Sequence, residues 1–335
     1  MQKIRIINGS YKIRGKDVDL AGMVFPMVEG FKWGTKGSYI TVDAKDVNGF
    51  PDRNIKIMVP DEKSFEKVDE TTAITQREET DEETIERLRE RFEMLEDMTK
   101  AAKKGDVRAM IVSGPPGVGK SFGVEKVLGK HDLIATLGEK APRYEVVKGA
   151  MSAIGLYCKL YNFADKDNVL VFDDCDSVLL DDLSLNILKA ALDSKKTRRI
   201  HWNTDSFKLR NEGVPDSFEF KGSAIFITNI KFDNVKSKKL RDHLEALESR
   251  CHYIDLTIDT LREKLLRIQQ IVKDGMLNSY ALPEGTQQEV VQYIWDNKRR
   301  LREISLRTVL KIADLAKAFP DTWKDMASST VLKPV

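Results

Sequence analysis

Apolar and polar residues follow two different patterns along this chain. Residues 1–60 carry short apolar runs, at 4–7, 39–42 and 55–59, separated by frequent glycines. Short apolar runs between turn residues are typical of strands, so we expect a small β-rich N-terminal module over residues 1–60. The stretch 61–83 is acidic, rich in threonine and poor in large apolar side chains, which favours a linker.

Strands and helices are expected to alternate over residues 84–258. Apolar residues three and four apart predict a first helix over 82–104, which Gly105 can end. Four apolar runs are typical of buried strands, with helical patterns between them, at 109–113, 144–147, 169–172 and 224–228. This alternation predicts an α/β domain with a parallel sheet. Residues 259–335 show helical patterns only and predict a small helical bundle.

Composition narrows the class of protein. The chain has 335 residues, 32% of them charged, and a formal net charge of +2. That balance excludes a strongly basic nucleic-acid coat, although local basic patches exist. Cys158, Cys175 and Cys251 show no metal-ligand spacing, as expected in a reducing interior. The N-terminus lacks a signal-peptide pattern and no apolar run is long enough to span a membrane, so we expect a soluble, cytoplasmic protein.

One motif indicates a phosphate-binding loop. The run Gly114-Pro115-Pro116-Gly117-Val118-Gly119-Lys120-Ser121 fits G-x-x-x-x-G-K-[ST] at every fixed position. It lies between a predicted strand and a predicted helix, where backbone N–H groups and the helix N-terminus attract phosphates. Lys120 can reach the β- and γ-phosphates, and the Ser121 hydroxyl can bind Mg²⁺. The sequence therefore predicts a site for a nucleoside triphosphate, taken as Mg-ATP.

Polar residues follow two of the later predicted strands. The run 169–172 ends in Asp173 and Asp174, and the run 224–228 ends in Asn229. After a phosphate loop, Asp173 is placed to join the Mg²⁺ shell and Asp174 to polarise the attacking water. Asn229 can hold that water or sense the γ-phosphate. The alternatives are an acidic turn after an ordinary strand and, for Asn229, a turn residue.

These motifs together resemble those of the AAA+ ATPases, over residues 85–335. The resemblance assigns residues 114–121 to Walker A, residues 169–174 to Walker B and Asn229 to sensor 1. It implies a P-loop AAA+ sheet domain followed by a helical lid. It also implies an ATPase that works as a ring-shaped homo-oligomer, with a hexamer as the family expectation.

Two arginines are candidates through the same resemblance. The segment Ser249-Arg250-Cys251 is similar to an element of clamp-loader ATPases, in which the arginine reaches a neighbouring subunit's nucleotide, with Arg241 as the reserve. Arg307 lies in a segment similar to sensor 2 and would contact the nucleotide of its own subunit. A surface ion pair for Arg250 and a solvated helix face for Arg307 are the alternatives.

The Walker B segment departs from the family. AAA+ proteins usually have Asp-Glu where this chain has Asp173-Asp174. The shorter Asp174 would hold a water differently, so hydrolysis can be slow, or Asp176 can share the role. Nucleotide binding is therefore the firmer expectation.

About 30 residues before the strand at 224–228 resemble the hairpin of one AAA+ branch. That branch includes viral replicative helicases and branch-migration motors, in several of which the hairpin touches DNA. The cations at 195–199 and Trp202 suit phosphate contact and base stacking. A solvated basic loop with Trp202 in the core is the equal alternative. We expect an ATPase coupled to translocation, unwinding or loading of DNA or RNA, in the style of a bacteriophage enzyme.

Two other functions stay open. A protein remodeller usually carries an aromatic residue in the loop after the second strand, whereas residues 148–151 here have none. A clamp-loader subunit would need a collar domain after the lid. Residues 1–60 contain no motif, and a protein partner for them is possible.

Overall fold

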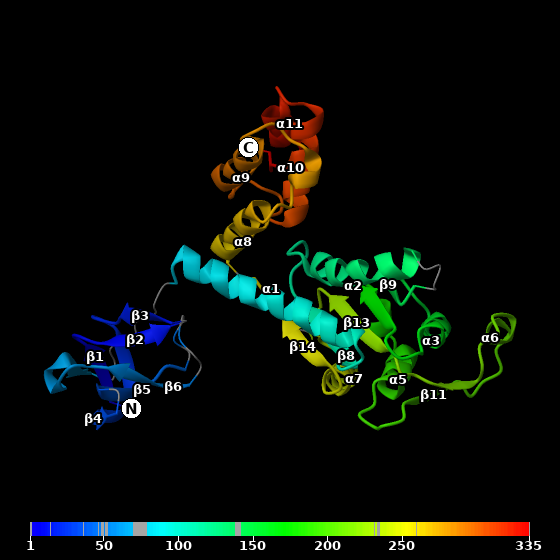
Figure 1. Ribbon diagram of the computed structural model, residues 1–335, viewed down its shortest axis with the longest axis horizontal. Helices are drawn as coiled ribbons and strands as arrows, with labels where there is room; N and C mark the ends of the chain where they lie inside the picture. The colour runs from blue at the N-terminus through cyan, green and yellow to red at the C-terminus, as the bar shows by residue number, and fades with distance from the viewer. Residues whose placement is uncertain are drawn as a thin grey trace. The chain divides into compact units, whose positions relative to one another are not determined.

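The computed structural model describes residues 2–13, 15–35, 37–45, 47, 50, 53–69, 79–137, 142–230, 232, 235–258 and 260–334. They divide into two compact units, Met1–Thr84 and Ile85–Val335 (Figure 1). Each unit is described by itself.

The N-terminal unit is a seven-stranded antiparallel sheet in the order β3-β2-β6-β5-β4-β1-β7. Its strands are β1 (Lys3–Ile6), β2 (Ser10–Ile13), β3 (Lys16–Asp19), β4 (Val24–Gly34), β5 (Gly37–Asp43), β6 (Asn54–Met58) and β7 (Phe65–Val68). Alternate residues point to one side and build a core around fully buried Phe25, Ile40 and Ile57. The predicted β-rich N-terminal domain is confirmed.

The linker predicted over residues 61–83 is wrong in its first part. A 3₁₀ turn at Glu62–Ser64 is followed by β7, which pairs with β1 in antiparallel register from Lys3↔Val68 to Ile6↔Phe65. The composition of this segment did not predict a strand, because only two of its four residues are apolar. Backbone pairing with β1 holds these residues in a strand. Helix α1 (Asp81–Lys103) takes the end of the segment. Residues 70–78 lie outside the described residues.

The second unit is built on a five-stranded parallel sheet in the order β14-β8-β13-β10-β9. Its strands are β8 (Ala109–Ser113), β9 (Tyr144–Lys148), β10 (Val169–Asp173), β13 (Ser223–Thr228) and β14 (His252–Asp255). The three central strands β8, β13 and β10 are buried along their whole length, as expected for a sheet covered on both faces.

Side chains alternate between two cores across this sheet. Val169, Val171 and Ile225 join one core, which includes α1. Leu170, Phe172 and Phe226 join the other, and the rings of Phe172 and Phe226 stack at 5.1 Å. The covering helices are α2 (Lys120–Leu137), α3 (Ala153–Asn162), α4 (Ser177–Leu180), α5 (Asp182–Ala191) and α7 (Lys238–Glu248).

The end of the chain is a helical lid with its own core (yellow to red in Figure 1). It contains α8 (Leu261–Lys273), a 3₁₀ turn at Asn278–Tyr280, α9 (Thr286–Asp296), α10 (Leu306–Ala318) and α11 (Trp323–Thr330). The predicted boundary at residue 259 lies outside the described residues. The predicted α/β domain with a parallel sheet, followed by a helical part, is confirmed. Among the helices of the described ranges, none is long and apolar enough to cross a membrane.

A hairpin precedes β13, as the sequence predicted. Strands β11 (Arg199–His201) and β12 (Ser217–Glu219) pair antiparallel, and the short helix α6 (Phe207–Asn211) lies between them. In Figure 1 this segment extends away from the sheet of its own unit.

Candidate functional site

The phosphate loop, residues 114–121, connects β8 to α2. Gly117 has a φ of +70°, and a Cβ there would lie 2.6 Å from Cβ of Ser305. Only glycine fits both the backbone conformation and this contact with the lid. The carbonyl of Gly117 accepts a 2.8 Å hydrogen bond from the N–H of Leu306, which ties the loop to the start of α10.

Lys120 is buried at the first position of α2, with 6% of its surface exposed. Its Nζ donates to the carbonyls of Gly114 at 2.6 Å and Pro115 at 2.9 Å, and to Oδ1 of Asn229 at 2.7 Å. Burial lowers the pKa of Lys120 to about 8, although the charges of Asp174 and Asp173 oppose that shift. A bound phosphate would therefore supply the negative charge that offsets the cost of burying this ammonium group.

Ser121 and Asp173 meet beside the loop. The Ser121 hydroxyl donates to Oδ1 of Asp173 at 2.8 Å, and Asp173 is buried at the end of β10. A hydroxyl and a carboxylate are the hard oxygen donors that Mg²⁺ takes from proteins, so this pair fits that ion. Nζ of Lys148 lies 3.3 Å from Oδ2 of Asp173 and also binds Glu125, a contact that the sequence did not predict.

Asp174 and Asn229 are brought together at the same end of the sheet. Nδ2 of Asn229 donates to Oδ1 of Asp174 at 2.8 Å. Asp174 has a φ of +51°, a conformation that aspartate adopts more readily than most residues. Asn229 thus contacts both Lys120 and Asp174. Asp176, the predicted substitute for Asp174, instead accepts a 2.7 Å hydrogen bond from the Thr228 hydroxyl.

The predicted arginines lie outside this network. Arg250 follows α7, and its Nη1 donates to the carbonyl of Ala246 in that helix. Arg241 donates twice to the carbonyl of Val235, at 2.7 and 3.2 Å. Arg307 is exposed in the first turn of α10, where its positive charge contributes to lowering the pKa of Lys120. Arg307 therefore lies on the site's side of the lid, whereas Arg250 contacts its own helix.

The hairpin exposes different residues from those that the sequence suggested. Trp202 packs against the core, with its ring 5.5 Å from that of Tyr157, and Arg198 is buried. Phe207, at the start of α6, has 72% of its surface exposed. The exposed cations are Lys195, Lys196, Arg199, Lys208 and Arg210. Of the two alternatives for Trp202, the structure therefore favours the one in the core, since the half-buried ring packs against the core cluster.

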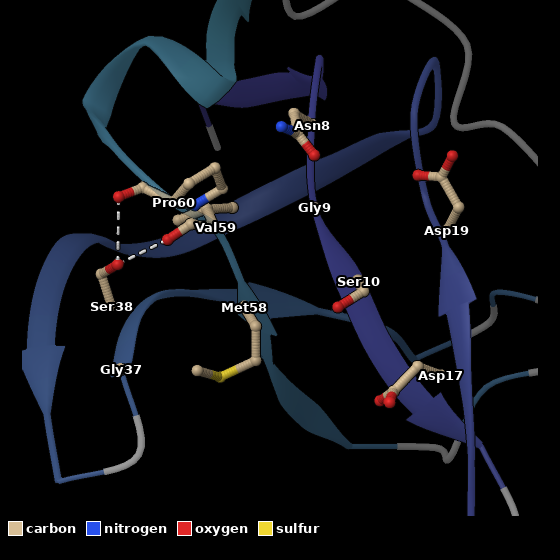
Figure 2. Close-up of a pocket in the computed structure, with 10 residues that line it drawn as sticks. All are labelled: Asn8, Gly9, Ser10, Asp17, Asp19, Gly37, Ser38, Met58, Val59 and Pro60. Carbon is tan, nitrogen blue, oxygen red and sulfur yellow. Dashed lines mark hydrogen bonds between the residues drawn. The ribbon is translucent and has the colours of Figure 1, made fainter.

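The described residues enclose two hollows, one in each unit. One, of about 490 Å³, adjoins the phosphate loop and is lined by Pro115, Val118 and Lys264, among others. The second belongs to the N-terminal unit, where no motif was found, and has about 530 Å³. Figure 2 shows Met58 between Ser38 on one side and Asp17 on the other, and the Ser38 hydroxyl donates to the carbonyl of Val59 at 2.6 Å.

Comparison with solved structures returns structures of DnaA and of Hsp104. A replication initiator DnaA bound to AMPPCP and single-stranded DNA has a TM-score of 0.39 and 14% identity, covering 69% of this chain and 63% of that one. Domain III of Thermotoga maritima DnaA gives 0.41 and 10%, covering 72% and 91%. Hsp104 of S. cerevisiae in complex with casein gives 0.41 and 15%, covering 73% and 40%. Similarity at this level carries no argument about substrate or partner.

Comparison of sequences gives a closer relationship. No family model matches the chain. An uncharacterized 36.7 kDa protein from the nrdC-mobD intergenic region of Enterobacteria phage T4 is 35% identical over 245 residues. The match covers 72% of this chain and 74% of the phage protein. The chain therefore belongs to the same family as this phage T4 protein.

Proposed function

We propose that the chain binds and hydrolyses Mg-ATP as an AAA+ ATPase. The observation that carries this proposal is the connected set of side chains at the carboxyl end of the sheet. Lys120 contacts Asn229, Asn229 contacts Asp174, and Ser121 contacts Asp173. A phosphate-binding cation, an oxygen pair for a metal and a carboxylate for water are the groups that phosphoryl transfer requires.

Each residue has one role in this proposal. The loop residues 114–121 and Lys120 bind the phosphates, and Ser121 and Asp173 would hold Mg²⁺. That ion would supply positive charge against the phosphate oxygens. Asp174 accepts a proton from, or orients, the attacking water, and Asn229 fixes the Asp174 carboxylate. Arg307 contacts the nucleotide from the lid.

The same proposal includes a ring of identical chains, with a hexamer as the expected state. Arg250 is the arginine that would reach the nucleotide of a neighbouring subunit. The support for this role is the likeness of residues 249–251 to the clamp-loader element, while the described hydrogen bonds of Arg250 go to Ala246 and Ser249 of its own chain. A fixed guanidinium charge can offset charge on the γ-phosphoryl group.

We propose nucleic acid as the partner on which the ATPase acts. The hairpin supports this choice, because Phe207 is exposed next to Lys208 and close to Arg210. An exposed aromatic ring stacks on bases, and cations contact phosphates. Phe207 takes the stacking role that the sequence had suggested for Trp202.

Remodelling of a protein is the second candidate. The N-terminal unit favours it, because Trp33 has 76% of its surface exposed in a separate compact unit, which suits recruitment of a protein partner. Under this alternative the nucleotide site and its residues stay the same.

ATP turnover by the full chain, with and without single-stranded or double-stranded DNA, tests the proposal. Stimulation of wild type that Phe207→Ala removes, while DNA-free turnover stays unchanged, would support a nucleic-acid motor. Lys208→Ala serves as the control, since removal of one cation should weaken the stimulation only partly. ATP turnover that neither form of DNA changes would favour the protein partner. No turnover at all would refute the ATPase.

A further inference from the structure

One lysine beside the proposed metal ligands has no role in the proposed function. Lys148 ends β9, and Asp173 ends the neighbouring strand β10. The parallel register pairs these two residues directly, so their side chains lie on the same face of the sheet. Nζ of Lys148 lies 3.3 Å from Oδ2 of Asp173. The strand pairing itself therefore brings this ammonium group to the carboxylate.

Lys148 has a second carboxylate within reach. Its Nζ donates to Oε1 of Glu125 at 3.0 Å, and Glu125 lies in α2, one turn after Ser121. Only 7% of the Asp173 side chain is exposed, whereas 60% of the Lys148 side chain is exposed. Asp173 is thus held by its surroundings, while Lys148 has room to move. The ammonium group can turn from Asp173 toward Glu125 and keep a partner.

The two oxygens of Asp173 have different partners. Oδ1 accepts a hydrogen bond from the Ser121 hydroxyl at 2.8 Å, and Oδ2 faces Lys148. A buried carboxylate needs a counter-charge, and Lys148 supplies one. Asp173 is also the proposed carboxylate ligand of Mg²⁺, an ion that takes hard oxygen ligands. Because like charges repel strongly at short range, Lys148 and Mg²⁺ compete for this carboxylate.

We infer that Lys148 neutralises Asp173 in the nucleotide-free protein and turns to Glu125 when Mg-ATP binds. This inference rests on the proposed function, because it needs Mg-ATP at the phosphate loop. Lys148 is a positioning residue that acts through Asp173. Its charge offsets part of the phosphate charge when ATP binds without metal, and it opposes the metal when Mg-ATP binds. Lys148 therefore limits how much Mg²⁺ strengthens nucleotide binding.

The test is the affinity of the full chain for AMPPCP, measured once in EDTA and once in excess Mg²⁺. The ratio of these two affinities is the Mg²⁺ enhancement. It compares each protein with itself, so a fraction of unfolded protein cancels. In Lys148→Met the enhancement should rise about fivefold, the upper range for a partly exposed ion pair. Lys148→Arg keeps the charge and should stay within about twofold of wild type.

Two results for Lys148→Met would overturn the inference. An enhancement within about twofold of wild type would mean that Lys148 and Mg²⁺ do not compete. A lower enhancement would mean that Lys148 assists the metal, for example by holding Asp173 in place.

Glu125→Gln should have the opposite effect. Loss of this charge leaves Asp173 as the carboxylate that Lys148 contacts, so the Mg²⁺ enhancement should fall about threefold. In a chain that already carries Lys148→Met, the same substitution should change the enhancement by less than about twofold, since no lysine remains to redirect. An equal fall in both backgrounds would mean that Glu125 acts on the metal directly, which contradicts the role of Lys148.

Another lysine pair that includes β9 provides a matched control. Nζ of Lys159 in α3 lies 2.5 Å from Oε1 of Glu145 in β9. Lys159→Met removes the same charge without changing a contact of Asp173, so it should leave the Mg²⁺ enhancement unchanged. An equal rise in Lys159→Met and Lys148→Met would mean that net charge causes the effect, which contradicts the inference.

Lys120→Ala separates failure of this inference from failure of the proposed function. If Mg-AMPPCP binds wild type and Lys120→Ala equally, the phosphate site is wrong and the role of Lys148 is refuted with it. If Lys120→Ala weakens binding but Lys148→Met keeps the wild-type enhancement, the nucleotide site stands and only the role of Lys148 is refuted.

Discussion

Two groups of predicted site residues differ in what they contact. Lys120, Asn229 and Asp174 bond to one another at the end of the sheet, as do Ser121 and Asp173. Arg250 bonds instead to the helix that precedes it. The first group is assembled by a single fold, because parallel strands bring their carboxyl ends to one edge. The role proposed for Arg250 would require a neighbouring subunit.

The largest effect is expected for Arg250. Arg250→Ala should lower ATP turnover about a thousandfold with little change in ATP affinity, because its charge matters most in the transition state. Steady-state turnover measures this, with Arg108→Ala as a matched arginine that bonds a backbone carbonyl, that of Asp193. Mixing Arg250→Ala with Lys120→Ala chains should restore turnover, since each supplies what the other lacks. Failure to restore it would remove the support for a role in a neighbouring subunit.

Asp174 belongs to the group of residues that bond to one another at the end of the sheet. Asp174→Asn should lower turnover about a hundredfold while ATP still binds, because the amide cannot take a proton from water. Asp174→Glu restores the residue common in AAA+ proteins and should keep turnover at or above the wild-type rate. Single-turnover hydrolysis and equilibrium binding separate the two steps. Full turnover in Asp174→Asn would show that another group activates the water.

Asn229 links the two ends of the network. Asn229→Ala removes one hydrogen bond from Lys120 and one to Asp174, so turnover should fall about tenfold through loss of their alignment. A thermal melt without nucleotide serves as the control for folding. Turnover within twofold of wild type would mean that the contacts seen here are not used in catalysis.

The smallest effect is a pH dependence from Lys120, whose pKa is lowered to about 8. Above pH 8 the free protein loses this proton, so ATP affinity should decline by up to about tenfold between pH 8 and 9. Stability has the opposite sign: between pH 8 and about 10.5 the unfolded chain holds the proton that the folded chain has lost, so stability rises with pH. Binding titrations at pH 7, 8 and 9 check this, and Lys120→Met should lack the trend.

Much of the second unit could be predicted because its sequence patterns are local. Strands that are buried on both faces are continuous apolar runs, and the phosphate loop is one contiguous motif. The polar residues after two of these strands could be placed near the loop by the parallel topology. Their mutual hydrogen bonds, and the pairing of Lys148 with Asp173, depend on side-chain geometry that the sequence pattern does not contain.

Other residues were missed for physical reasons. Arg267 is buried in α8. It lies between Leu266 and Ile268 in an amphipathic helix, and nothing in the sequence distinguishes it from a solvated arginine. Its burial results from the approach of α1, which is distant in sequence. Strand β7 is specified by pairing with β1 rather than by its own composition. Trp202 could equally have been core or surface until the position of Tyr157 was known.

Equilibrium binding of Mg-ATP to wild-type chain and to Lys120→Ala tests the central claim most directly. Lys120 donates to the phosphate loop and to Asn229. We expect Lys120→Ala to keep its fold, as a thermal melt would show. Its affinity for ATP should fall at least about a hundredfold, since a charged contact and its desolvated surroundings are both lost. Equal affinity in the two proteins would contradict the claim that the connected side chains at the end of the sheet form a nucleotide site.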